Sequence, residues 1–205
     1  MAIDKTISKV ENKLSTIQAG GLGIMGLEEE DASILPIPFV RVVQGQSKDT
    51  TMKDGKEAPE GYFFFNDTRE AVKDLNFAII KSKVVLVDFE RDGEVKRVPQ
   101  RKILGMTLDT KKLFILTISV GSFSNYGRLV AEMKQNKITE VWANLVTATS
   151  KKTENDKGKF FVVEFALGEK LTNEDRVEMG LAFEQYKRIF EKKEVEETET
   201  EATPF

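Results

Sequence analysis

Alternation of apolar and polar side chains dominates the middle of the chain. Between residues 36 and 168, apolar residues recur at every second position or in short runs, and Gly, Asn, Asp and Pro separate the runs. This pattern is typical of β-strands with one or both faces buried. Strands are expected at residues 39–44, 62–65, 77–89, 95–98, 112–120, 139–149 and 159–167.

Three segments have helical spacing instead. Residues 3–17 carry apolar side chains at helical intervals between charged ones, which predicts a short amphipathic helix. A second helix is expected to begin with Ser122 or Ser124 as its cap and to end near Asn136. Residues 172–175 resemble a capping box with Asp in place of Glu, so a third helix is expected there.

The order of these elements predicts a mainly β (α+β) chain built around a five-stranded, OB-like β-barrel. The strand at residues 77–89 is long enough to bend and to serve two sides of a barrel. Strands, one helix and a terminal hairpin follow the order of the OB-fold, in which a helix lies between the third and fourth barrel strands. The expected regions are an N-terminal helix with a flexible linker, the barrel, a C-terminal helix and a disordered acidic tail, at residues 1–33, 34–170, 171–193 and 194–205.

The residue types that are missing narrow the range of functions. The chain has no cysteine and no histidine, which excludes disulfides, thiolate metal sites and the commonest general base. Carboxylate, lysine or serine catalysis stays open, but a protein that is not an enzyme and holds no metal or cofactor is favoured. No apolar run reaches the roughly 18 residues of a membrane span, and no secretory signal is present, so a cytoplasmic protein is expected.

The formal net charge of -3 conceals an uneven distribution. Residues 37–170 contain 23 basic and 18 acidic residues, whereas residues 191–205 contain 2 basic and 6 acidic ones. A basic body followed by an acidic tail is compatible with binding to a polyanion such as nucleic acid.

Cations and aromatic rings are interleaved along the body, and this combination binds single-stranded nucleic acid. Lys81 and Lys83 lie two residues apart on one expected strand and therefore project from the same face. Further candidate cations lie on the return strand, on the internal helix and around the hairpin loop expected at residues 150–158: Arg97, Arg101, Lys102, Arg128, Lys151, Lys152, Lys157 and Lys159. Such a lysine-rich loop either closes over DNA or only keeps the hairpin tip solvated.

Several aromatic rings are candidates for stacking against bases. In the strand at residues 62–65, Tyr62 and Phe64 share one face and the other two phenylalanines share the opposite one. One pair is exposed if a single face meets the core, and core packing is the competing interpretation for each ring. Phe123, at the start of the internal helix, is a further candidate. Trp142 fits a stacking platform and a core anchor equally well.

The acidic tail ends in Pro204 and Phe205. A charge run usually only solubilises a chain end, but a purely solubilising tail gains nothing from a terminal aromatic ring. A flexible tail whose ring fills an apolar pocket, and whose terminal carboxylate meets a basic rim, would recruit other proteins. Pro204 and Phe205 are therefore the candidate partner-binding residues.

Short motifs in both regions carry a family resemblance. The ending Ala202-Thr203-Pro204-Phe205 is similar to the acidic tails of bacterial single-stranded DNA-binding proteins, although it lacks the Ile that those tails place before Pro. The body resembles the bacteriophage-encoded single-stranded DNA-binding proteins over about residues 37–168, in motifs such as Gly61-Tyr62-Phe63-Phe64-Phe65-Asn66 and Lys81-Ser82-Lys83-Val84. A Cys-rich insertion found in some phage relatives is absent. The resemblance implies an OB-fold protein that binds single-stranded DNA in replication, recombination or repair and recruits partner proteins through its tail.

Two other functions stay open from the residues alone. A viral structural or assembly protein would explain the β-rich body and the N-terminal helix, but not the terminal Pro-Phe. A metal-dependent nuclease would need clustered carboxylates such as Asp88, Glu90 and Asp92 to hold Mg²⁺. The oligomeric state is also open, and a homo-oligomer is compatible with the sequence.

Overall fold

The computed structural model describes residues 37–91, 94–156 and 158–186, with the backbone alone at residues 89–91 and 94. The chain divides into two compact units, Met1–Pro36 and Ile37–Phe205, and every described residue belongs to the second. The expected N-terminal helix, Lys157 and the tail with Pro204 and Phe205 lie outside the described residues.

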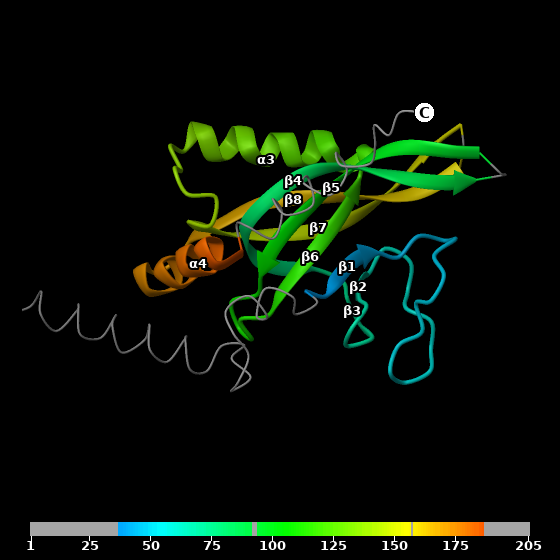
Figure 1. The fold of residues 1–205 in the computed structure, drawn as a ribbon, viewed down its shortest axis with the longest axis horizontal. Helices are drawn as coiled ribbons and strands as arrows, with labels where there is room; N and C mark the ends of the chain where they lie inside the picture. Colours follow the sequence, from blue (N-terminus) through cyan, green and yellow to red (C-terminus); the bar gives the residue numbers. More distant parts are fainter. Residues whose placement is uncertain (1–36, 92–93, 157, 187–205) are drawn as a thin grey trace, which may run out of the picture. The chain divides into compact units, whose positions relative to one another are not determined.

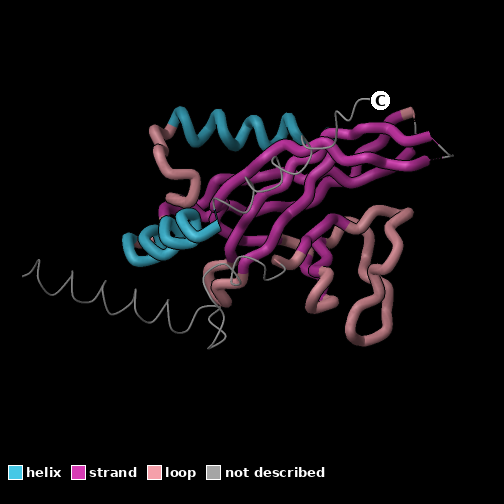
Figure 2. Tube along the Cα trace, viewed as in Figure 1, coloured by secondary structure: helices cyan, strands magenta, loops and turns pink. Residues whose placement is uncertain are grey.

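The described residues form a mainly β structure, as expected: a curled sheet of eight strands with two α-helices (Figures 1 and 2). The strand order across the sheet is β3-β2-β1-β6-β5-β4-β7-β8. The elements are β1 Phe39–Val42, β2 Phe63–Phe65, β3 Glu70–Val72, β4 Leu75–Arg91, β5 Glu94–Met106, β6 Leu113–Ser119, the 3-10 turn η1 Val120–Ser122, α3 Phe123–Gln135, β7 Asn144–Asn155, β8 Gly158–Lys170 and α4 Asn173–Tyr186.

The long strand expected at residues 77–89 is β4, and it pairs with two other strands. It pairs with β7 over residues 75–77 and with β5 from Ala78 to Arg91. A bulge between Ile79 and Lys81 interrupts the register with β5, and such a bulge bends the strand. The main core of the sheet contains Ile79, whereas Ile80 belongs to a second core.

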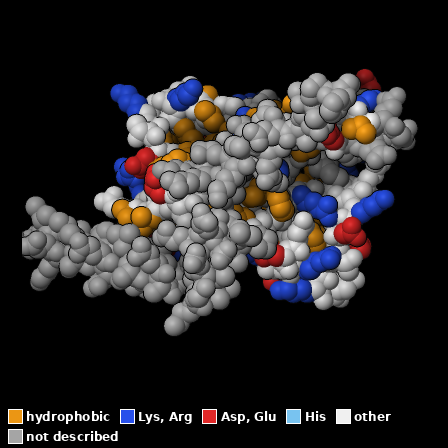
Figure 3. Space-filling model, viewed as in Figure 1, with side chains coloured by type: hydrophobic (Ala, Val, Ile, Leu, Met, Phe, Trp, Pro, Cys, Tyr) orange, Lys and Arg blue, Asp and Glu red, His pale blue; other side chains and the backbone are white. Residues whose placement is uncertain are grey.

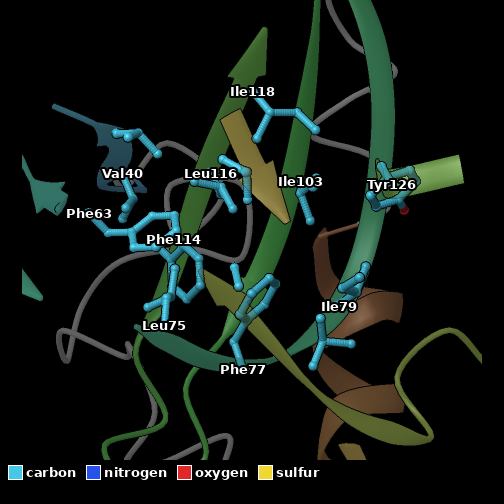
Figure 4. Packing of buried hydrophobic residues seen from close by; sticks show 14 of the residues in the cluster. Val40, Phe63, Leu75, Phe77, Ile79, Ile103, Phe114, Leu116, Ile118 and Tyr126 are labelled. Carbon is cyan, nitrogen blue, oxygen red and sulfur yellow. The ribbon is translucent and has the colours of Figure 1, made fainter. Parts of the chain in front are cut away.

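The main hydrophobic core lies on one side of the sheet, which we call the inner face. The ring of Phe114 packs edge-on against Phe65 and Phe77, at centroid distances of 5.9 and 5.3 Å. Ile103 and Leu116 come from neighbouring strands and point toward the same cluster (Figure 4). Because these side chains are fully or almost fully buried, the core holds the central strands together.

The helix α4 covers one end of the opposite side, the outer face, where Met179 and Tyr186 pack with Ile80 and Leu104. The expected N-terminal signal of this helix is confirmed, since the amide of Asp175 donates to the Thr172 hydroxyl at 3.1 Å. Val177 on the same helix is 48% exposed.

An ion-pair cluster fastens α4 to the turn between β5 and β6. Lys111 Nζ lies 2.9 Å from carboxylate oxygens of both Asp175 and Glu178. Partial burial alone would lower the pKa of Lys111, but the hydrogen bonds to Glu178 and Asp175 outweigh it, so the pKa is raised. The charged form of Lys111 therefore helps to hold the helix in place.

Polar side chains form hydrogen bonds with backbone groups of β8, the last strand at one edge of the sheet. The side-chain amide of Gln44 donates to the carbonyl of Phe161 at 3.0 Å and accepts from its amide at 2.8 Å, as a neighbouring strand would. The Ser122 hydroxyl accepts from the amide of Val163, and Asn125 donates to the carbonyl of Val163, both at 2.9 Å. These bonds join β8 to α3 and to the segment after β1, and they protect an edge that could otherwise pair with another chain.

Two expected boundaries around the last hairpin are wrong. The strand expected from residue 139 begins only at Asn144, and the loop expected at residues 150–158 is mostly strand. The ladder continues until Asn155 opposes Gly158. Polar residues suggested a loop, but this end of the ribbon is solvent-exposed, so its strands need no alternating apolar pattern.

Candidate nucleic-acid interface

The part of the outer face that α4 leaves uncovered carries a group of cations. In the ladder between β4 and β5, Lys83 lies directly opposite Lys102, and Lys81 lies opposite Leu104. Since directly opposed residues share a face, and residues two apart share it as well, these three lysines project from the same side. By the same alternation along the strands, Phe39 and Arg41 of β1 and Lys96, near the start of β5, project from this side as well. We call the whole set the basic face: Phe39, Arg41, Lys81, Lys83, Lys96 and Lys102.

The charged residues that define the basic face are all cations. Like charges directly opposite each other in a ladder destabilise the pairing, and Lys83 and Lys102 are such a pair. Among the described side chains at outer positions of β1, β4, β5 and β6, none is a carboxylate. A bound anion would relieve the repulsion between the two lysines.

An exposed aromatic ring lies beside these cations. Phe39 is 42% exposed, and the ammonium of Lys102 lies 5.5 Å from its ring centroid. Arg41 donates from Nη2 to the carbonyl oxygens of Lys48 and Asp49, at 2.6 and 3.3 Å, and these carbonyls do not neutralise its charge. Figure 3 shows Lys and Arg side chains beside hydrophobic ones over the region of β1 to β3, with Asp and Glu side chains among them. The basic face thus offers both a ring and positive charge.

The expected cations of the return strand are divided between the two faces. Lys102 joins Lys81 and Lys83, but Arg97 and Arg101 project inward. The guanidinium of Arg101 lies 4.4 Å from the Tyr126 ring centroid and 5.5 Å from that of Phe123. These contacts hold α3 against the sheet, so Arg101 and Phe123 are not part of the basic face.

Three of the candidate stacking rings lie outside the basic face. Phe64 is not available for stacking, because the loop after β1 covers the second face of β2 and buries the ring to 1% beside Val43 and Ala58. Tyr62 is half-buried. Trp142 precedes β7 in a turn, and its indole packs on Phe183 at 4.9 Å, which favours the core-anchor interpretation.

The remaining candidate cations lie away from the basic face. Lys151 pairs with Glu164 at 3.3 Å, and Lys159 opposes Glu154 in the ladder between β7 and β8. Lys152 lies 4.0 Å from a Glu60 oxygen. Arg128 is exposed on α3. Carboxylates therefore accompany Lys151, Lys152 and Lys159 on this ribbon.

Sequence reasoning missed Phe39 and Arg41. The signal was present, because Val40 and Val42 are buried on the inner face and the residues between them must point outward. The two residues occupy a short strand that pairs with β6. Its position beside Lys102 depends on this parallel pairing, which no local pattern predicts.

Other kinds of site have little support in the described part of the chain. No group of three or more acidic side chains that could hold a metal ion is found there. Of the carboxylates considered for a nuclease, Asp88 pairs with Arg97 at 3.2 Å, and the side chains of Glu90 and Asp92 lie outside the described residues. A cavity of about 430 Å³ lies between the end of α3, the start of β7 and α4, and its lining includes Lys137, Asn144 and Arg176. None of the expected site residues lines it. Within residues 37–91, 94–156 and 158–186, no helix is long and apolar enough to cross a membrane.

Comparison with known proteins identifies no relative. No family model matches the chain, and neither the curated proteins nor the solved structures contain a match. The function is therefore inferred from the geometry and charge of the basic face.

Proposed function

We propose that the protein binds and protects single-stranded DNA, independently of sequence, on the basic face, and that it is not an enzyme. The observation that carries this proposal is the directly opposed pair Lys83 and Lys102, with Lys81 on the same face and the exposed ring of Phe39 beside it. Cations along a surface together with an uncovered aromatic ring are what binding of unpaired strands requires.

Each component of the basic face has a distinct part in this proposal. A phosphate between Lys83 and Lys102 offsets their mutual repulsion. Lys81 and Lys96 extend the positive charge along the strand direction, and Arg41 on β1 extends it across the sheet. From Lys96 to Lys102 the strand rises about 20 Å, enough to contact several nucleotides. Phe39 favours an unpaired base, since a base in a duplex has no free face for stacking.

The proposal includes an OB-like arrangement of the central strands, and the order of these strands along the chain supports it. The strands β4, β5 and β6 are consecutive and antiparallel, α3 follows β6, and the β7–β8 hairpin returns to pair with β4. In the OB plan a helix likewise separates the third and fourth strands, and the face of strands two and three binds the nucleic acid. Here β5 and β6 would be those strands, and Lys102 lies on the first of them.

The acidic tail has a separate part in the proposal. Its ending, Pro204 and Phe205, recruits replication or recombination proteins, while its carboxylates keep it off the DNA. The support for this part is the sequence of the tail.

The proposal is tested by titrating a dye-labelled dT oligomer with the protein and following anisotropy at several salt concentrations. We expect binding at low salt, with log K falling as log salt rises with a slope of about -2 to -4, because each contacted phosphate of a single strand contributes about -0.7. A duplex of the same length should bind more weakly. The absence of binding to the oligomer even at low salt would remove the proposal.

Variants at one position separate stacking from charge. Phe39→Leu removes the ring and should weaken binding about 10-fold with little change in the salt slope, whereas Phe39→Tyr should bind like the wild type. Equal affinities for all three proteins would exclude Phe39 from the interface.

A further inference from the structure

Exposed aliphatic side chains are concentrated on the inner side of the β4–β5 ribbon. Val84 and Leu86 of β4 are 41% and 63% exposed, and Val95 of β5 is 65% exposed. The register places all three on one face, since Val84 opposes Arg101 and Leu86 opposes Pro99. The same ribbon therefore carries cations on its outer side and aliphatic groups on its inner side.

The core of the protein ends just before this aliphatic surface. The last contacts from α3 to the ribbon are the hydrogen bond of 2.8 Å between the hydroxyls of Tyr126 and Ser82 and the stacking of Arg101. Val84 and Leu86 follow immediately on β4, where the ribbon passes beyond α3. Several large aliphatic side chains exposed together on one face are typical of a protein interaction site.

The charges on this surface indicate what covers it. Asp88 and Arg97 oppose each other, and Arg97 bonds to Asp88 through Nε at 3.2 Å. Within the described residues, the two terminal nitrogens of the Arg97 guanidinium make no hydrogen bond or ion pair. A surface with one free donor group, one carboxylate and aliphatic neighbours is complementary to itself under a two-fold rotation. It does not suit a polyanion, because it contains a carboxylate and few cations.

We propose that two copies of the chain associate through the inner sides of their β4–β5 ribbons. Val84 and Leu86 form the apolar centre of the interface, and Val95 adds an apolar contact on the far side of the Asp88–Arg97 pair. Arg97 binds the partner's Asp88 with its terminal nitrogens. The basic faces of the two copies then point away from each other. The dimer is independent of the DNA-binding proposal, and it supplies two binding surfaces in one particle.

The absence of cysteine in the chain allows a direct test. A single cysteine is introduced as Leu86→Cys, and Val177→Cys on α4, where Val177 is 48% exposed, serves as the matched control. Under mild oxidation, L86C should form a disulfide-linked dimer and V177C should stay monomeric. Equal cross-linking of the two variants, or none in L86C, would overturn the proposal.

Light scattering measures the mass of the wild type and of variants with exchanged charges, and so tests the dimer without a cross-link. The wild type should have twice the chain mass of 23.1 kDa, and Leu86→Lys should have the monomer mass. Asp88→Arg should also be monomeric, and the double exchange Asp88→Arg with Arg97→Asp should restore the dimer. A wild type that is monomeric at every concentration contradicts the proposal. The L86K variant should still bind the dT oligomer with the affinity per chain of the wild type. If the protein does not form the proposed dimer, the proposed function therefore still stands.

Discussion

The double variant Lys83→Glu with Lys102→Glu should lose affinity for single-stranded DNA on the order of 100-fold at low salt. The two side chains oppose each other across the ladder, so the exchange turns the centre of the basic face acidic. Two lost phosphate contacts should also reduce the magnitude of the salt slope by about 1.4. Anisotropy titrations with a dT oligomer measure both quantities.

The matched control makes the same change in net charge on another surface. Arg128→Glu with Lys134→Glu places two carboxylates on exposed positions of α3. This variant should retain most of the affinity, because only the long-range field changes. If both double variants weaken binding equally, net charge and not the basic face governs binding.

The substitution Gly105→Ala should lower the free energy of unfolding by about 3 kcal/mol. A Cβ at this position would lie 2.5 Å from the Phe77 ring and 2.9 Å from the Phe114 ring. Both rings are fully buried and pack edge-on against each other, so neither can withdraw without opening the main core. Denaturant unfolding of the variant and the wild type measures the difference.

The same substitution at Gly127 should raise the free energy of unfolding. Gly127 lies in the middle of α3, away from the ends of the helix, and is exposed to solvent. A Cβ at this position would meet no atom within 4 Å. Alanine is better than glycine in a helix by about 1 kcal/mol, so Gly127→Ala should stabilise the protein. A stable Gly105→Ala protein would show that the packing around Phe77 and Phe114 is looser than described.

Strand positions were predictable from the sequence where the hydrophobic pattern is long. The β4 segment carries apolar runs at residues 77–80 and 84–87, and Ile79 and Ile80 are both buried, on different faces. The β3 strand was missed because its three residues form no alternating pattern. Its place at the sheet edge depends on pairing with β2, a contact that local propensity does not encode.

The candidate site was predictable only in part, for a similar reason. Spacing alone places Lys81 and Lys83 on one face, and the structure agrees. Exposure of an aromatic ring depends on what covers it: Phe64 is buried by the loop after β1, whereas Phe39 is left uncovered. Both outcomes are set by contacts between distant segments, and a strand pattern cannot distinguish them.

Ultraviolet cross-linking of a dT oligomer to the full chain, followed by peptide mass spectrometry, tests the central claim most directly. Attachment is expected at Phe39 and at the peptides that carry Lys81, Lys83 and Lys102, and excess unlabelled oligomer should compete with it. Cross-links confined to α3 or to the ribbon around Lys151, with the basic face unmodified, would contradict the account.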